Sequence, residues 1–163
     1  PSHSNVRSLT ITGGAYSHET PWISGLCNLD LLVCRSLEVR HLLSCFTRLR
    51  TLQVDERSYD TLKLWSQLTS LQTLRSGTKP LLTLPNSPIL TNLSELIIWP
   101  EVSDLDRLLR LTPFVTRLEC DKVEVSTLLS NVRFLATRIP PTSPLSTLNN
   151  LRFYRCKLLE YVK

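Results

Sequence analysis

A short spacing of apolar residues recurs along the whole chain and predicts how it folds. The spacing is apolar-x-x-apolar-x-apolar, and its first copy consists of Val6, Leu9 and Ile11. Such a unit predicts a short β-strand whose fourth and sixth positions point into a core while their neighbours face the other way. The eight copies are Val6/Leu9/Ile11, Leu26/Leu29/Leu31, Leu49/Leu52/Val54, Leu71/Leu74/Ser76, Leu93/Leu96/Ile98, Val115/Leu118/Cys120, Val132/Leu135/Thr137 and Leu151/Tyr154/Cys156.

The regular step between these copies indicates stacked repeats rather than chance leucine richness. Their first residues are 6, 26, 49, 71, 93, 115, 132 and 151. Steps of this size are typical of solenoids, in which a unit too small to bury its own apolar side packs on its neighbours. We therefore expect an α/β solenoid of about eight irregular repeats, curved like part of a horseshoe, with short parallel strands on its concave face.

The segments between the strand copies have a different period and should form the convex face. Three of them predict helices, capped by Ser36, by Asp60, and by Ser103 or its neighbour Asp104. The third helix should place Leu105, Leu108 and Leu109 inward and end at Pro113. Prolines in the ranges 80–88 and 140–144 predict extended segments or short helical turns instead.

Composition supports a folded domain. Hydrophobic residues make up 42% of the chain and charged residues 20%, which differs from the composition of disordered segments. We expect residues 1–163 to form a single domain. The chain contains no methionine and begins at Pro1, so we expect it to be a fragment of a longer protein.

The cysteines indicate the cellular location of the protein, and the distribution of charge indicates what kind of partner it binds. The five cysteines are odd in number and scattered, which favours reduced core residues and an intracellular location, in cytoplasm or nucleus. The triplet Asn92-Leu93-Ser94 matches a glycosylation sequon and keeps a secreted alternative open. No apolar run is long enough to cross a membrane, and the net charge of +5 is spread out rather than gathered in a basic stripe. We therefore expect a protein partner, with neither a nucleic acid nor a membrane involved.

The sequence offers no set of residues for catalysis. His41 and Cys45 fall on adjacent turns of one predicted helix, but two ligands do not make a zinc site. Asp104 and Asp106 are better explained by the dipole at a helix N-terminus than by acid catalysis. We predict that the chain is not an enzyme and has no catalytic residue, metal site or cofactor.

The residues flanking the strand leucines should line the concave face, at the third, fifth and seventh positions of each repeat. Aromatic residues and arginines gather there in the C-terminal half, and both types are enriched at the energetic centres of protein interfaces. The alternative is that irregular register turns some of the aromatic residues into the core or under a loop. The candidate partner-binding residues are Arg75, Ile97, Trp99, Arg117, Phe134, Arg138, Phe153 and Arg155.

The repeated apolar spacing from Val6 to Cys156 resembles that of the leucine-rich-repeat superfamily. Uneven repeat lengths, scattered cysteines and helix-bearing convex segments make it most similar to the divergent F-box and leucine-rich-repeat proteins of fungi. That resemblance implies the substrate-recognition part of a ubiquitin ligase, reaching the ligase core only through an F-box upstream of this sequence. The phrase from Leu68 to Leu74 also resembles intracellular immune receptors, which implies a ligand-sensing region instead.

Overall fold

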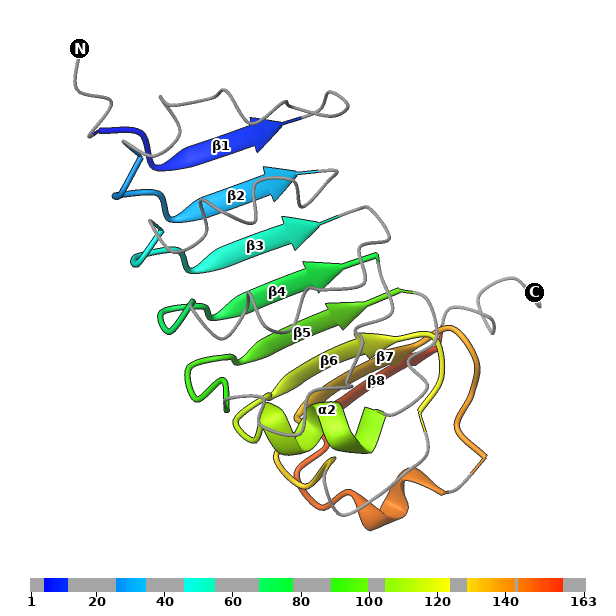
Figure 1. The fold of residues 1–163 in the computed structure, drawn as a ribbon. Coiled ribbons are helices and arrows are strands. Elements are labelled where there is room, and N and C mark those ends of the chain that lie inside the picture. The colour runs from blue at the N-terminus through cyan, green and yellow to red at the C-terminus, as the bar shows by residue number, and fades with distance from the viewer. Residues whose placement is uncertain are drawn as a thin grey trace.

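The structure is a computed structural model in which eight parallel strands form one continuous sheet. Strand order along the sheet follows the sequence, from β1 to β8, as expected for a solenoid (Figure 1). The strands are β1 (Ser8–Ile11), β2 (Leu31–Cys34), β3 (Thr51–Val54), β4 (Thr73–Ser76), β5 (Glu95–Ile98), β6 (Arg117–Cys120), β7 (Phe134–Thr137) and β8 (Phe153–Cys156). The structure describes residues 5–11, 26–34, 46–54, 68–77, 89–99, 105–123, 129–142 and 144–156.

Each strand has two inward positions, which build the core. In β3, Leu52 and Val54 are fully buried while Thr51 and Gln53 remain partly exposed. The strands pair in register, so Leu52 lies beside Leu74, and Leu74 beside Leu96. A column of leucines thus runs through the solenoid. The predicted leucine-rich-repeat architecture is confirmed, because alternation within each strand and register between strands place the same positions inside.

The turn that leads into each strand connects it to the preceding repeat. The side-chain amide of Asn92 donates to the Thr69 carbonyl at 2.6 Å, and that of Asn150 donates to the Ser130 carbonyl at 2.7 Å. Asn131 makes the equivalent bond to Pro113. These amides occupy the position just before the first apolar residue of a repeat. They satisfy carbonyl groups that the strand ladder does not reach.

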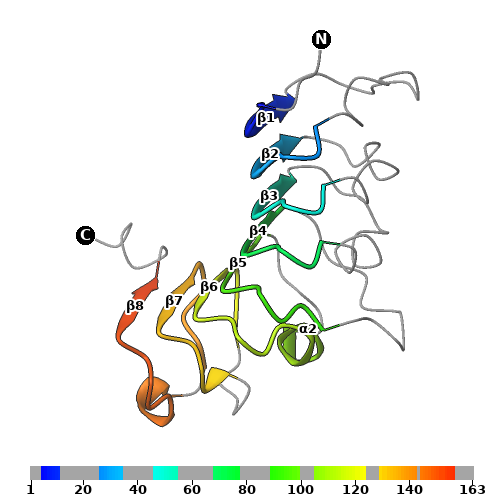
Figure 2. The ribbon, with the colours of Figure 1, turned by 90° about the vertical axis from the view of Figure 1, so that its left-hand side faces the viewer.

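The convex side carries one α-helix in the described part of the chain, α2 (Leu105–Leu111), behind β5 and β6 (Figure 2). Leu108 and Leu109 are buried and Leu105 packs on the core, as predicted. The Thr112 hydroxyl donates to the Leu108 carbonyl at 3.0 Å, and Pro113 follows. In the seventh repeat, the prolines precede a short 3-10 helix, η4 (Leu145–Thr147), which confirms the expected helical turn.

The predicted register of the second repeat is wrong by three residues. Ser8 pairs with Leu31, so the repeat begins at Leu29 rather than Leu26, and its inward strand residues are Leu32 and Cys34. Leu32, which we expected on the concave face, is fully buried in the core. Leu26 is also buried, and it is the first residue of the turn before β2. Its backbone carbonyl accepts the backbone N–H of Leu29 at 3.1 Å.

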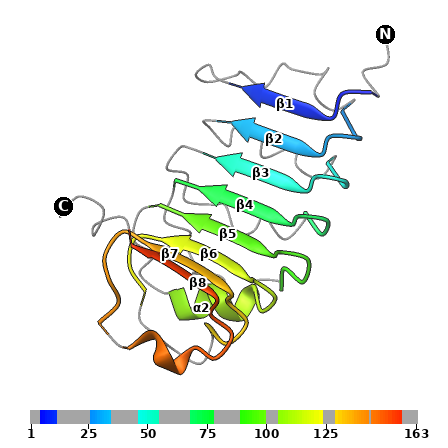
Figure 3. The same cartoon turned by 180° about the vertical axis from the view of Figure 1, so that it is seen from behind.

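The sheet bends between its two halves. Figure 2 shows β1 to β4 stacked almost in line, whereas β6 to β8 turn toward one side, opposite the side that carries α2. Figure 3 shows the sheet from behind, with β7 and β8 drawn close beside β6. The predicted helices after Ser36 and Asp60, with the pair His41 and Cys45, lie outside the described residues. Within the described ranges, no helix is long and apolar enough to span a membrane.

Candidate functional site

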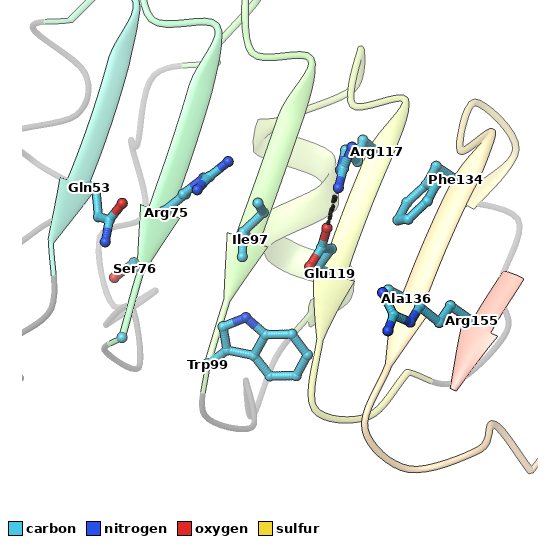
Figure 4. A pocket seen from close by; sticks show the side chains of 11 residues that line it. Gln53, Arg75, Ser76, Ile97, Trp99, Arg117, Glu119, Phe134, Ala136 and Arg155 are labelled. Carbon is cyan, nitrogen blue, oxygen red and sulfur yellow. Dashed lines mark hydrogen bonds and ion pairs between the residues drawn. The ribbon is translucent and has the colours of Figure 1, made fainter. Parts of the chain in front are cut away.

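A groove occupies the concave face where the sheet bends. It encloses about 630 Å³ and draws its lining from β3 to β8 and the residues that follow two of these strands. Figure 4 shows Ile97 and Trp99 in the middle, with Arg75 on one side and Phe134 on the other. The lining residues are Gln53, Arg75, Ser76, Gly77, Ile97, Trp99, Arg117, Glu119, Phe134, Ala136 and Arg155.

An ion pair and two stacked rings form one wall of the groove. Nε and Nη2 of Arg117 both donate to Oε1 of Glu119, at 3.1 and 2.7 Å. The Arg117 guanidinium also lies 4.3 Å from the ring centroid of Phe134, a cation–π contact. The Phe134 ring stacks on Phe153 with centroids 4.8 Å apart and planes 8° from parallel. Each side chain of this wall therefore contacts the next one.

A second arginine is held at the edge of the groove. Nη1 of Arg138 lies 3.4 Å from Oδ1 of Asp121, and its guanidinium carbon lies 5.9 Å from the Trp99 ring centroid. The Asp121 oxygen is buried and has no hydrogen-bond partner among the described residues, so its neutralisation comes from this ion pair. The Arg138 side chain itself is 64% exposed. Solvent therefore weakens the pair, and Arg138 remains accessible to a ligand.

The floor of the groove is apolar. Ile97 is only 8% exposed, yet it lies outside the hydrophobic cluster of the core, so its burial comes from its neighbours on the concave face. Ala136 is 1% exposed, and the Arg155 side chain runs toward it in Figure 4. A small residue here leaves room between the larger ones. The floor thus offers apolar contact area beneath a rim of charged groups.

Arg75 differs from the other arginines of the groove. It is exposed on β4, and among the described residues no hydrogen bond or ion pair to its guanidinium is formed. Figure 4 shows the side chain extending over the groove toward Ile97. Arg75 therefore presents a positive charge with its hydrogen-bond donors available.

The structure brings the eight candidate residues together at one site. Six line the groove, and the other two touch it, because Phe153 stacks on Phe134 and Arg138 lies over Trp99. None of the three aromatic residues belongs to the core cluster, so the structure does not place them in the core. The candidate residues did not include Glu119 and Asp121, the acidic partners of Arg117 and Arg138. The signal for Glu119 was its position two residues after Arg117, which puts both side chains on one face of a strand.

The inward thiols differ chemically from this surface. Burial, followed in importance by the nearby negative charge of Asp121, raises the pKa of Cys120 to about 12. The thiol therefore stays protonated at neutral pH and is a poor nucleophile. Among the described residues, no three His, Cys, Asp or Glu side chains are grouped as metal ligands would be.

Comparison with known proteins supports the fold. The sequence matches no protein-family model and no curated protein. Among solved structures, an internalin (inlF) from Listeria monocytogenes is similar, with a TM-score of 0.62 and 18% identity over 93% of this chain. The match spans 48% of that internalin's length. An internalin C2 (inlC2) from the same organism has a TM-score of 0.53 and 22% identity, over 82% of this chain and 73% of its own.

Proposed function

We propose that this chain is a protein–protein interaction scaffold that binds its partner in the concave groove. The observation that carries the proposal is the gathering of Trp99, Phe134 and Phe153 with four arginines on one ordered surface. Tryptophan, tyrosine and arginine dominate the energetic centres of interfaces, and phenylalanine is enriched at such interfaces. The apolar floor and charged rim also follow the usual anatomy of such a surface.

Preorganisation favours binding at this surface. Binding costs free energy when loose side chains become ordered, at about 0.5–1.5 kcal/mol for each immobilised side chain. Here Arg117 is already fixed between Glu119 and Phe134, and Phe134 is fixed against Phe153. Much of that ordering cost is therefore met during folding. The strand register supports the same argument, because it anchors most of the lining side chains on a rigid sheet.

The biological role that we propose is substrate recognition within an F-box type of ubiquitin ligase, inside the cell. The uneven repeats, the helix α2 and the cysteines at inward positions support this assignment. Cys120 and Cys156 lie on β6 and β8, two strand spacings apart, or about 9.6 Å, which is too far for a disulfide. Reduced thiols suit the cytoplasm or nucleus. The ligase core would be reached through a separate F-box.

Affinity purification with groove variants tests the proposal. The bait is the full-length protein, compared with its Trp99→Ala and Phe134→Ala variants, and captured proteins are identified by mass spectrometry. Phe114→Ala is the matched control, because Phe114 is 57% exposed and lies outside the groove. We expect one protein to be retained by wild type and control and lost from both groove variants.

One outcome would count against the use of the groove, and the identity of the captured proteins decides between the two biological roles. A partner captured equally by all four proteins does not use the groove, provided that circular dichroism shows the variants to be folded. Ligase components among the captured proteins support the F-box assignment. Capture through a nucleotide-binding domain of the same full-length chain would favour the immune-receptor assignment instead.

A further inference from the structure

We infer that the partner presents an acidic, extended segment to the groove, with a carboxylate on Arg75 and apolar side chains over Ile97 and Trp99. The inference deepens the proposed function and rests on it. Its basis is the balance of charge on the lining and the position of Arg75, for which no ion pair is formed among the described residues.

The lining of the groove is unbalanced in charge. It contains three arginines, Arg75, Arg117 and Arg155, and one acid, Glu119. Arg117 already neutralises Glu119 at 2.7 Å, and Arg138 beyond the lining is paired with Asp121. The excess charge is therefore positive. Field lines concentrate in a concave site, so an approaching segment with carboxylates is attracted and a basic one repelled.

Arg75 is placed to bind a carboxylate while the rest of the segment lies on the floor. It stands on β4, and its strand partner on β5 is Ile97, the buried apolar residue of the groove. A guanidinium forms two parallel hydrogen bonds with a carboxylate, which fixes the orientation of the bound group. A side chain next to that carboxylate then falls on Ile97 or Trp99. The pattern expected in the segment is thus acidic residues interspersed with apolar ones.

The size of the groove suits a short stretch of chain. From Arg75 on β4 to Arg155 on β8, the part of the lining proposed to hold the segment covers four strand spacings, which is about 19 Å along a flat sheet. An extended segment of about six residues covers that distance. The bend shortens the path on the concave side, so six residues is an upper figure.

A nucleic acid fits this surface less well, although it too is an anion. Single strands bind where ring faces are open for base stacking and where basic groups follow the backbone. Here Phe134 is covered by Arg117 on one side and stacks on Phe153. Glu119 and Asp121 would also lie close to phosphates. The observations therefore favour a protein segment.

Peptide binding to the purified chain tests the inference. The probe is a fluorescein-labelled peptide of about ten residues, longer than the groove, alternating glutamate with leucine or phenylalanine. Its matched control has glutamine in place of glutamate, and an oligothymidylate of similar length tests for a general polyanion site. Fluorescence polarisation is measured for wild type, Arg75→Glu and Arg48→Glu. Arg48 is an exposed arginine outside the groove and controls for the change in net charge.

We expect the glutamate peptide to bind wild type about tenfold more tightly than the glutamine peptide, a difference of about 1.4 kcal/mol, because only glutamate can form a charge pair with Arg75. Arg75→Glu should remove most of that difference, and Arg48→Glu should leave it unchanged. Raising the salt concentration should weaken the glutamate peptide alone.

Equal binding of the two peptides, no effect of Arg75→Glu, or tighter binding of oligothymidylate would each overturn the inference. So would the failure of both peptides to bind at about millimolar concentration, the weakest affinity expected for a specific site. These results leave the proposed function standing if Trp99→Ala and Phe134→Ala still abolish capture of the full-length partner. If these two variants capture the partner as well as wild type does, both the proposed function and this inference are refuted.

Discussion

Phe134 and Leu135 are adjacent in β7 but lie on opposite faces of the sheet, and their alanine variants should differ in stability. Leu135 is fully buried in the core, and Leu135→Ala should lower the free energy of unfolding by about 3–4 kcal/mol, the usual cost of a leucine-sized cavity. Phe134 is outside the core cluster. Its contacts are the Arg117 guanidinium at 4.3 Å and the Phe153 ring at 4.8 Å.

The magnitude for Phe134→Ala follows from those two contacts. The cation–π contact contributes about 0.5–1 kcal/mol. The stacked ring pair contributes about 0.5–1.5 kcal/mol beyond area burial. The loss of unfolding free energy should therefore be about 2 kcal/mol, roughly half the effect of Leu135→Ala, although phenylalanine is the larger side chain.

Urea denaturation followed by circular dichroism measures both variants against wild type. Leu135→Ala should lose more unfolding free energy than Phe134→Ala, because only Leu135 faces the core. If Phe134→Ala destabilises the chain as much as Leu135→Ala, Phe134 contributes to the core and the concave placement is refuted. A Phe153→Ala variant adds a check, because it should remove the ring pair but leave the Arg117 contact with Phe134 in place.

Three further predictions concern the effect of single side chains on stability. Asn92→Ala should lower unfolding free energy by about 1 kcal/mol in urea denaturation, since it removes the bond to the Thr69 carbonyl, whereas Asn92→Ser should cost less. Tyr154→Phe should cost a similar amount, because it leaves the buried Thr137 hydroxyl without the partner that lies 3.1 Å away. The raised pKa of Cys120 means that the folded state holds this proton more tightly than the unfolded state, so stability should fall as pH rises between about 9 and 12. Unfolding free energies measured from pH 8.5 upward should decline less steeply for Cys120→Val, and an identical decline would refute this assignment.

Most of the fold was predictable because the strand pattern and the helix signals are local. The alternation of Leu52 and Val54 with polar neighbours defines both faces of β3 without knowledge of any other repeat. The helix α2 was equally predictable from its apolar spacing and from Pro113 beyond its end. The same local reasoning gave the inward direction of Leu108 and Leu109.

The second repeat shows where local pattern is insufficient. Leu26, Leu29 and Leu31 satisfy the apolar spacing, and so do Leu29, Leu32 and Cys34, so periodicity alone cannot choose between them. The deciding feature is Asn28, which precedes Leu29 as Asn92 precedes Leu93. In the later repeats an asparagine at this position bonds to the preceding turn. The position of the turn, rather than the number of leucines, therefore marks where a repeat begins.

The site was predictable as a set of positions but not as a network of contacts. Register alone places Arg117, Phe134 and Phe153 at the third position of neighbouring repeats, so their proximity follows from the sequence. Whether Arg117 turns toward Glu119, and whether its guanidinium covers a ring, depends on side-chain rotamers. The burial of Ile97, on a face expected to be exposed to solvent, could not be predicted from the sequence either. It arises from neighbouring side chains on the concave face.

The bend and the groove are parts of one arrangement. Gln53 on β3 and Arg155 on β8 line the same hollow, although five strand spacings, about 24 Å on a flat sheet, separate them. They share it because β6 to β8 turn toward the concave side while α2 lies behind β5 and β6 (Figure 2). A helix needs about 10 Å of width where strands need about 5 Å, so a helix on the convex side spreads that side and closes the opposite one. The bend therefore lies where α2 packs behind the sheet, and the aromatic and arginine side chains of the groove lie on the concave side of that bend.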